Sequence, residues 1–325
     1  MGGSETARLK NKEYDRWWRG VEEAENRLPD ASLIHAMDRE GDSYPLLANL
    51  LGAKRSFVIR WYLDRRAKAP QDTSENWQKA SELLADARNT RLRREVLLGK
   101  RKAKTAPRLA RARGHQARDR RTATLRIARC TLVFKKPHCY PKALGYPNTI
   151  TVNAVRVYEP HPPAGEEPIE WVLLTNLSIA NADDITRVVD IYRQRWTIEE
   201  FFKAIKSGCN YRKRHLTNSQ SILNTLATFV PIASKALLLR QAAQAPSSPA
   251  SAVLEATEMK VLRAKAAKLN QPLGRRPTAR DALLAIARMG GHRRSSGPPG
   301  WATIMKGMER FLILVEGWQL AEAKK

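Results

Sequence analysis

The chain has 325 residues, of which 42% are apolar, enough for a sizeable core and for more than one structural unit. Its 58 Lys and Arg outnumber 32 acidic residues, giving a formal charge of +26. This excess favours a polyanionic partner, with nucleic acid the first candidate and an acidic membrane surface the second. Three cysteines without paired spacing exclude a disulfide framework and a zinc knuckle. No apolar run approaches the length of a membrane span, so we expect no membrane partner.

The first sixty residues predict an α/β unit. An apolar run stops at Asp38, as a buried strand does at a polar edge. Asp42 and Ser43 are candidate caps for the helix that follows. Strand, helix and strand in this order place Asp38 at the carboxyl end of a strand, where such sheets hold their sites. The expected elements are a helix over residues 11–28, a strand over 32–37, a helix over 44–53 and a strand over 56–61.

A strongly basic segment runs from Arg88 to Arg129. It contains sixteen Lys or Arg against Glu95 and Asp119, a local excess of +14 and more than half of the net charge. Such a segment predicts a phosphate-binding surface whose affinity weakens with salt. A solvated, partly disordered basic loop is the simpler interpretation, and the two are compatible.

The rest of the chain predicts strands followed by helices. Alternating or continuous apolar residues predict strands over 125–134, 148–158 and 171–175. Asp183 and Asp184 precede a long helix that we expect to continue to Lys206. Beyond Cys209 we expect mostly helix, interrupted at residues 245–251, 274–277 and 293–300.

Four residues of the long helix form a candidate site. Tyr192, Arg195, Glu199 and Lys206 stay within roughly 60° of one another at about 100° per residue, with apolar residues on the neighbouring flank. A carboxylate framed by two cations and a phenol suits phosphodiester chemistry, which needs an acidic metal ligand beside phosphate-holding groups. An amphipathic helix with a solvated charged face is the alternative.

These spacings resemble a known family. Tyr192-x2-Arg195-x3-Glu199-x6-Lys206 is similar to the Tyr-Arg-Glu-Lys motif of bacterial insertion-sequence cut-and-paste transposases, which belong to the DDE group with a ribonuclease H-like core. MDREGDSYPLLANL, residues 37–50, resembles the segment around that family's second catalytic Asp, and Arg60 also falls where the family has an arginine. Later segments agree in order and character, so the resemblance covers essentially the whole chain.

The resemblance implies a role for each matching residue. Asp38 and Glu199 would be catalytic and would bind Mg²⁺, for which Mn²⁺ can substitute. DNA-binding roles fall to Arg60, Tyr192, Arg195 and Lys206 at phosphates, and to Trp171 and Trp196 against the DNA end, where a base is flipped out. From the residues alone, core packing is an even alternative for each tryptophan, and a helix cap is the alternative for Asp38.

The resemblance also implies the reaction and the partners. Two metal ions would activate a water for in-line attack, and the freed 3′-hydroxyl would form a hairpin and finally attack target DNA. The partners would be double-stranded transposon ends and target DNA, in a bacterial, nucleoid-associated cytoplasmic setting. A homodimer would form through the C-terminal helix, expected over 301–321 with Trp301, Ile304, Met308, Phe311, Leu312, Val315 and Leu320. Packing of this helix onto its own domain is the alternative.

We therefore expect an α/β fold with an incomplete ribonuclease H-like core, a β-rich basic insertion and a mostly helical C-terminal region. The expected divisions are a partial core over 1–61, the insertion over 62–175, the remaining core with the Glu helix over 176–245, and a dimerisation region over 246–325.

The chain also departs from its relatives. The family carries a first catalytic Asp many tens of residues before the second, but only 37 residues precede Asp38, and neither Asp15 nor Asp30 is placed to replace it. We expect an N-terminally truncated transposase that cleaves DNA poorly or not at all by itself. One alternative is a DNA-binding or dimerising fragment that inhibits the full-length enzyme. Another is a basic protein that associates with RNA or the ribosome.

Overall fold

The computed structural model describes residues 13–100, 117–140, 145–209, 216, 218–270 and 272–323. By contact, the chain divides into two compact units, an N-terminal unit of residues Met1–Arg195 and a C-terminal unit of residues Trp196–Lys325. We describe each unit by itself. The division into four segments that the family resemblance implies, at residues 1–61, 62–175, 176–245 and 246–325, stays a prediction.

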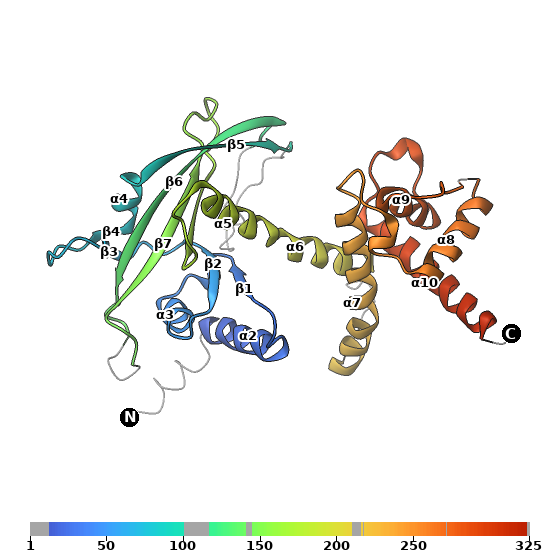
Figure 1. The fold of residues 1–325 in the computed structure, drawn as a ribbon, viewed down its shortest axis with the longest axis horizontal. Coiled ribbons are helices and arrows are strands. Elements are labelled where there is room, and N and C mark those ends of the chain that lie inside the picture. Colours follow the sequence, from blue (N-terminus) through green and yellow to red (C-terminus); the bar gives the residue numbers. More distant parts are fainter. Residues whose placement is uncertain are drawn as a thin grey trace. The chain divides into compact units, whose positions relative to one another are not determined.

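The N-terminal unit is built on one eight-stranded mixed sheet (Figure 1). The strands follow the order β1-β2-β8-β7-β6-β3-β4, and β5 pairs with β6 off this path. Only β1 and β2 are parallel among the paired strands that the structure describes. This arrangement confirms a mixed α/β fold. The strands are β1 (Ile34–Met37), β2 (Ser56–Arg60), β3 (Arg66–Lys68), β4 (Gln78–Lys79), β5 (Arg88–Leu98), β6 (Arg121–Lys135), β7 (Thr149–Tyr158) and β8 (Glu170–Thr175).

The predicted strand–helix–strand unit is confirmed. Helix α2 (Glu13–Arg27) precedes β1, and α3 (Tyr44–Gly52) crosses from β1 to its parallel neighbour β2. The side chain of Ser43 accepts a hydrogen bond from the Leu46 N–H and caps α3. Asp42, the other candidate cap, is used differently, as described below.

Helices cover both faces of the sheet, because successive residues of a strand point to opposite sides. In β2, Phe57 and Ile59 join the core beneath α2, α3 and α4 (Ala80–Ala85), whereas Val58 joins the core beneath α5 (Ala182–Gln194). In β8, Leu173 belongs to the core beneath α5, whereas Val172 and Leu174 belong to the core beneath α2, α3 and α4. Both faces of the central strands are therefore buried.

The basic segment forms regular structure at both of its ends, which corrects the interpretation as a loop. Strand β5 pairs with the first part of β6 from Arg88↔Arg129 to Leu98↔Arg121, with a register shift between Asn89 and Arg93. Residues 101–116 of this segment lie outside the described residues. Some of its cations have internal partners. Arg94 forms two hydrogen bonds of 2.7 and 2.8 Å with the Asp190 carboxylate.

The predicted single helix up to Lys206 is wrong in its details. Helix α5 ends at Gln194, α6 covers Trp196–Lys203, and the next turn (η3, Ala204–Gly208) is π-helical. The boundary between the two units falls at Arg195 and Trp196. A π turn is wider than an α turn, so Lys206 departs from the position that a regular helix predicts.

The C-terminal unit is helical, as predicted. Small and aliphatic residues fill its core, and α9 crosses α10 where Gly290 and Gly307 face each other's backbones. The remaining elements are α7 (Ser219–Ala242), η5 (Ala250–Ala252), α8 (Ala256–Lys268), α9 (Ala279–Met289), η6 (Arg294–Ser296) and α10 (Trp301–Glu322).

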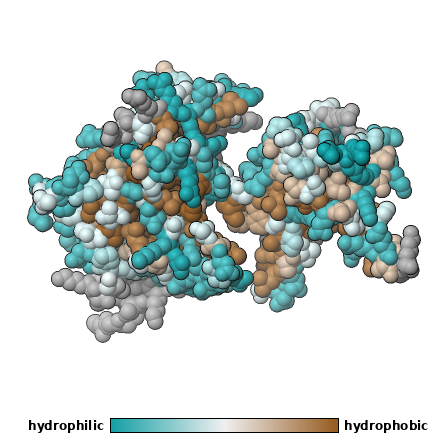
Figure 2. All heavy atoms as spheres, viewed as in Figure 1, coloured by the Kyte–Doolittle hydropathy of each residue, from teal (hydrophilic) through white to brown (hydrophobic). Residues whose placement is uncertain are grey.

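Helix α7 is long and apolar enough to cross a membrane by length and composition, with 22% of the relevant window buried. The expectation that no apolar run reaches this length is therefore wrong. One side of α7, including Phe229, Ala233 and Leu239, nevertheless packs into the core of the C-terminal unit. Leu223, Val230 and Leu238 are exposed, and hydrophobic residues are visible along this helix (Figure 2).

Most residues of α10 that were expected at a dimer interface lie in the core of their own unit. Five of the seven, Trp301, Ile304, Met308, Phe311 and Val315, are buried there, and Leu312 packs against them. Packing onto its own domain therefore accounts for this face. The hydrophobic residues that α10 exposes are Ile313, Leu314, Trp318 and Leu320.

Candidate active site

The parallel pair β1 and β2 brings Asp38 and Arg60 to the same end of the sheet. Met37 is opposite Ile59, and the next residue of each strand is Asp38 or Arg60. Carboxyl ends of parallel strands form one edge, so the carboxylate and the guanidinium originate side by side. Strand order in the sequence predicts the strand-end position of Asp38, and the family resemblance singles out Arg60 at the end of the next strand.

The Asp38 carboxylate caps the short turn η1 (Arg39–Gly41). Its Oδ1 accepts a hydrogen bond of 3.0 Å from the Glu40 N–H. The cap that we considered as an alternative is thus present, but it engages one oxygen. No hydrogen bond among the described residues engages Oδ2. The residue is half-buried, so this oxygen remains able to act as a ligand.

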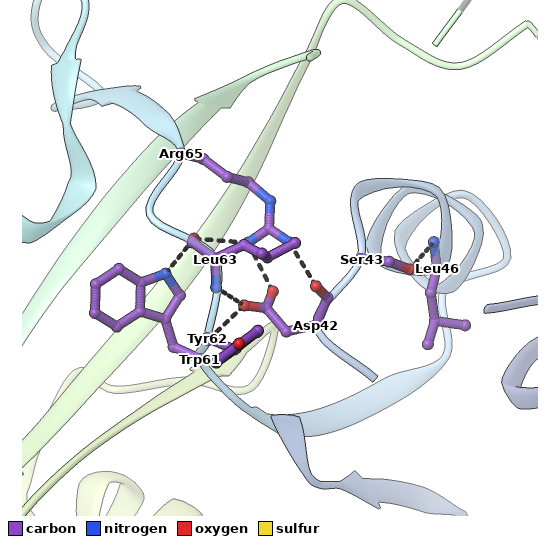
Figure 3. A network of polar contacts seen from close by, with 7 residues as sticks. All are labelled: Asp42, Ser43, Leu46, Trp61, Tyr62, Leu63 and Arg65. Atoms are coloured by element: carbon purple, nitrogen blue, oxygen red, sulfur yellow. Dashed lines mark hydrogen bonds and ion pairs between the residues drawn. The ribbon is translucent and has the colours of Figure 1, made fainter. Parts of the chain in front are cut away.

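Asp42 anchors the loop that follows β2 (Figure 3). Its Oδ2 accepts hydrogen bonds from the Tyr62 N–H at 2.6 Å and the Leu63 N–H at 2.8 Å. Its Oδ1 forms a 2.6 Å ion pair with Arg65, whose side chain is 4% exposed against 0% for Asp42. Arg65 also donates to the Asp42 carbonyl and lies over the Phe134 ring. The network therefore joins the loop after β1 to the loop after β2.

A cavity of about 430 Å³ opens between these loops and strands β7 and β8. It brings the predicted residues Arg60 and Trp171 together. The other cations and aromatic side chains of its lining carry no local signal in the sequence, because β7–β8 pairing and the loop geometry bring them together. The lining residues that matter here are Arg39, Arg60, Trp61, Tyr62, Arg156, Glu170 and Trp171.

Charges in this cavity are predominantly positive. Three arginines line it against one acid, Glu170, which pairs with Arg156 at 2.6 Å. The Arg39 guanidinium lies 6.0 Å from the centre of the Tyr62 ring, which is 58% exposed. Trp171 adds an aromatic ring to the lining. A ligand with several acceptor oxygens and negative charge would satisfy these groups.

Tyr192 and Arg195 lie behind Trp171 in the N-terminal unit. The Tyr192 and Trp171 rings meet edge to face with centres 5.9 Å apart, and the Arg195 guanidinium is 5.8 Å from the Tyr192 ring. Tyr192 is only 2% exposed and belongs to the α5 core. Its ring therefore supports Trp171 and Arg195 from inside the unit.

Glu199, Trp196 and Lys206 belong to the C-terminal unit. Trp196 is 58% exposed, so the alternative of core packing is wrong for this residue. Glu199 is half-buried, and the Lys206 Nζ lies 5.0 Å from the Phe202 ring. The neighbouring Glu200 is held by Lys203 at 2.6 Å and by the Trp301 indole N–H at 2.8 Å. The hydrogen bond from Lys203 lowers the pKa of Glu200, with the Trp301 bond as a further cause.

Comparison with known families shows to which family the chain belongs. Residues 28–229 match the model of the Transposase DDE domain, which is more than half of the chain and includes every predicted site residue. The chain belongs to the Transposase DDE domain family. It is therefore a transposase in this general sense, and transposases act on DNA.

Domains of the DDE transposase family generally use divalent metal ions. The Asp38 oxygen has the ligand chemistry that Mg²⁺ prefers. The residues that the structure describes contain no group of three or more His, Cys, Asp or Glu that could hold a metal ion. Asp38 thus fits as a single ligand, and a complete site needs a further carboxylate beside it.

Proposed function

We propose that this transposase binds double-stranded DNA at transposon ends and cuts and joins its phosphodiester bonds in a metal-dependent reaction. The observation that carries the proposal is the cationic, aromatic cavity beside Asp38. Arg39, Arg60 and Arg156 supply charge for phosphate oxygens, and the aromatic side chains of the lining supply surface for sugar or base. A ribonuclease H-like core agrees with the mixed sheet and with Asp38 at a strand end.

We assign the metal ligands to Asp38 and Glu199. A bound Mg²⁺ or Mn²⁺ supplies Lewis-acid chemistry at the scissile phosphate. Asp38 contributes from the end of β1, where its Oδ2 is not engaged by hydrogen bonds among the described residues. Arg60 holds the phosphate, and Arg195 and Lys206 neutralise the adjacent backbone. The exposed Trp196 ring would stack on a base displaced from the duplex, which offsets part of the cost of extrusion.

The metal assignment is tested by replacing Mg²⁺ with Fe²⁺ and adding ascorbate, because radicals formed at bound iron cleave the nearby protein backbone. We expect cleavage beside both Asp38 and Glu199, and Glu199→Gln should abolish it at both places. Glu200→Gln is the matched control, since the Glu200 carboxylate is already engaged by Lys203 and Trp301. Unchanged cleavage beside Asp38 in Glu199→Gln would contradict a shared metal site.

We further propose that the chain alone cuts DNA weakly. The family resemblance expects another catalytic Asp on a neighbouring strand. Among the described residues β1 pairs only with β2, so its other edge is open to a further strand. A nicking assay with Mg²⁺ or Mn²⁺ on transposon-end DNA tests this point. Efficient nicking that Asp38→Ala abolishes would overturn it, whereas binding without nicking leaves the alternative role as an inhibitor of the full-length enzyme.

A homodimer through α10 is part of the same proposal. Its support is the exposed hydrophobic set Ile313, Leu314, Trp318 and Leu320, which is distinct from the residues in the core of the unit. Burial of such a set favours association. Light scattering should give a dimer for the wild type and a monomer for Ile313→Asp, while Glu309→Gln should remain dimeric. A monomeric wild type at high concentration would contradict the proposal.

A further inference from the structure

The C-terminal unit contains a second cationic cavity, of about 870 Å³, between the end of α7, helix α9 and the segment before α10. This volume is in the range of ligand sites, roughly 300–1,000 Å³. Its walls combine apolar side chains with Arg240, Arg280, Arg288 and His292, and amides from Gln244 and Asn270. Every one of these residues belongs to the C-terminal unit.

The arginines of this cavity retain unused hydrogen-bonding capacity. The side chains of Arg280 and Arg288 form no hydrogen bond or ion pair with the described residues. Arg240 lies 4.6 Å over the Trp301 ring, and its Nη2 is 4.0 Å from Glu200, but its buried Nη1 has no partner in the described part of the chain. An anionic ligand would satisfy the guanidinium groups of Arg280 and Arg288.

Local charge balance favours an anion. Asp281 is the one acidic residue that lines the cavity. Its Oδ2 accepts hydrogen bonds from the Thr278 N–H at 2.9 Å and the Thr278 hydroxyl at 2.8 Å, in the capping box of α9. That carboxylate is therefore committed to the helix N-terminus and does not neutralise the three guanidinium groups.

The rim of the cavity is held in place by bonds that leave the arginines available. Arg263 donates to the carbonyls of Gly274 and Arg275, both at 2.8 Å, and Gly274 lines the cavity. The His292 N–H bonds to the Ala287 carbonyl at 3.0 Å and closes the end of α9. These hydrogen bonds fix the backbone around the cavity arginines, which lowers the entropy cost of binding a ligand.

We propose that this cavity binds a phosphate group, carried either by the DNA backbone or by a free nucleotide. Arg280 and Arg288 grip the phosphate oxygens, Arg240 adds positive charge, and the apolar wall with Leu283 and Pro298 contacts the sugar or base. The DNA source rests on the proposed function. It would give the transposase a DNA contact in its C-terminal unit that is separate from the cavity beside Asp38.

The test is nuclear magnetic resonance of the full chain with labelled histidine, which gives at most six signals. His292→Gln assigns the local one. The chain is titrated with a short DNA duplex and separately with deoxyadenosine monophosphate. We expect the chemical shift of His292 to change in at least one of the two titrations. The ligand that changes it shows whether the bound phosphate comes from DNA or from a free nucleotide. Absence of movement in both arms overturns the proposal.

A double variant, Arg280→Gln with Arg288→Gln, provides the second measurement. It should abolish the movement, and if the source is DNA it should reduce the slope of log K against log salt by about two. Lys306→Gln removes an exposed charge elsewhere on the unit and should leave the His292 response intact. Arg280→Gln alone serves if the double variant does not fold. Retained movement in a folded variant also overturns the site, whereas the metal test at Glu199 is unaffected by either result.

Discussion

Asp42 organises the cavity beside Asp38 without lining it. It receives two backbone N–H groups from the loop that presents Trp61 and Tyr62, and it pairs with the buried Arg65. A carboxylate that accepts this many donors fixes the path of the loop. Asp42 is therefore a positioning residue for the aromatic side chains of the cavity.

Asp42→Asn should destabilise the chain by about 3–5 kcal/mol, because it leaves the Arg65 charge buried without its partner. Urea unfolding measures the loss. The matched double variant, Asp42→Asn with Arg65→Met, should recover much of the stability, since the uncompensated charge is gone. If the double variant were as unstable as the sum of both single variants, the ion pair would not be the cause.

Glu159 should make stability depend on pH. Hydrogen bonds from Arg121, at 2.5 and 3.0 Å, are the main cause that lowers the pKa of this buried carboxyl. A lowered pKa in the folded state stabilises the fold above the unfolded value of about 4.3, and this contribution disappears as pH falls through the folded value. Glu159→Gln should cost roughly 1.5–3 kcal/mol at pH 7 and much less near pH 3. Thermal melts at both values check this, and an equal loss at both would contradict it.

Some residues of the candidate site follow from local sequence patterns, and others depend on pairing between distant strands. Asp38 and Arg60 end apolar runs that read as parallel strands, so their common edge follows from local pattern. Arg156 reaches the cavity through the register of β7 against β8, which pairs it with Val172. No local signal encodes that register. The position of Asp42 just before α3 predicts a helix cap. Its actual partner, Arg65, lies in a loop distant in sequence, so no local pattern indicates the ion pair.

The close crossing of helices α9 and α10 depends on two glycines, Gly290 and Gly307. A Cβ at Gly290 would lie 1.9 Å from the Thr303 carbonyl oxygen, and a Cβ at Gly307 would lie 2.0 Å from that of Ile286. Both obstacles are backbone atoms, which cannot rotate away as a side chain can. The absence of side chains at these positions lets the two helices approach closely.

Gly307→Ala should therefore destabilise the C-terminal unit by about 3 kcal/mol or more, because the helices must separate. Gly317→Ala on the same helix is the control, since a Cβ there meets nothing within 4 Å. It should be neutral or stabilise by up to roughly 1 kcal/mol through helix propensity. Thermal unfolding compares the two, and equal effects would show that the crossing is not as close as described.

Elements with a strong repeat were predictable, and elements that depend on distant pairing were not. The apolar runs of β1, β2, β7 and β8 read as strands because each carries its own burial pattern. Strand β5 was missed because its many arginines indicate a solvated loop, and only pairing with β6 makes it a strand. The long helix is interrupted at Arg195 without a Pro or Gly nearby, so the sequence contains no helix-breaking signal at this point.

For the whole molecule, the charge of +26 is the dominant physical property. Strands β5 and β6 carry eight Lys or Arg against one Glu, a local excess of +7. Arg93 and Arg126 are both exposed and face each other directly across the two strands. Like charges in this position repel and destabilise a strand pair. A polyanion bound between them would remove that repulsion.

Replacing both residues, Arg93→Gln with Arg126→Gln, should therefore change stability and DNA binding in opposite directions. Thermal stability should stay equal or rise slightly, because the cross-strand repulsion is removed. The slope of log K against log salt for a DNA duplex should become shallower by about two, as two phosphate contacts are lost. Arg94→Gln is the neighbouring control, because Arg94 is bound to Asp190 and its loss should lower stability. An unchanged salt slope in the double variant would place the DNA-binding surface elsewhere on the chain.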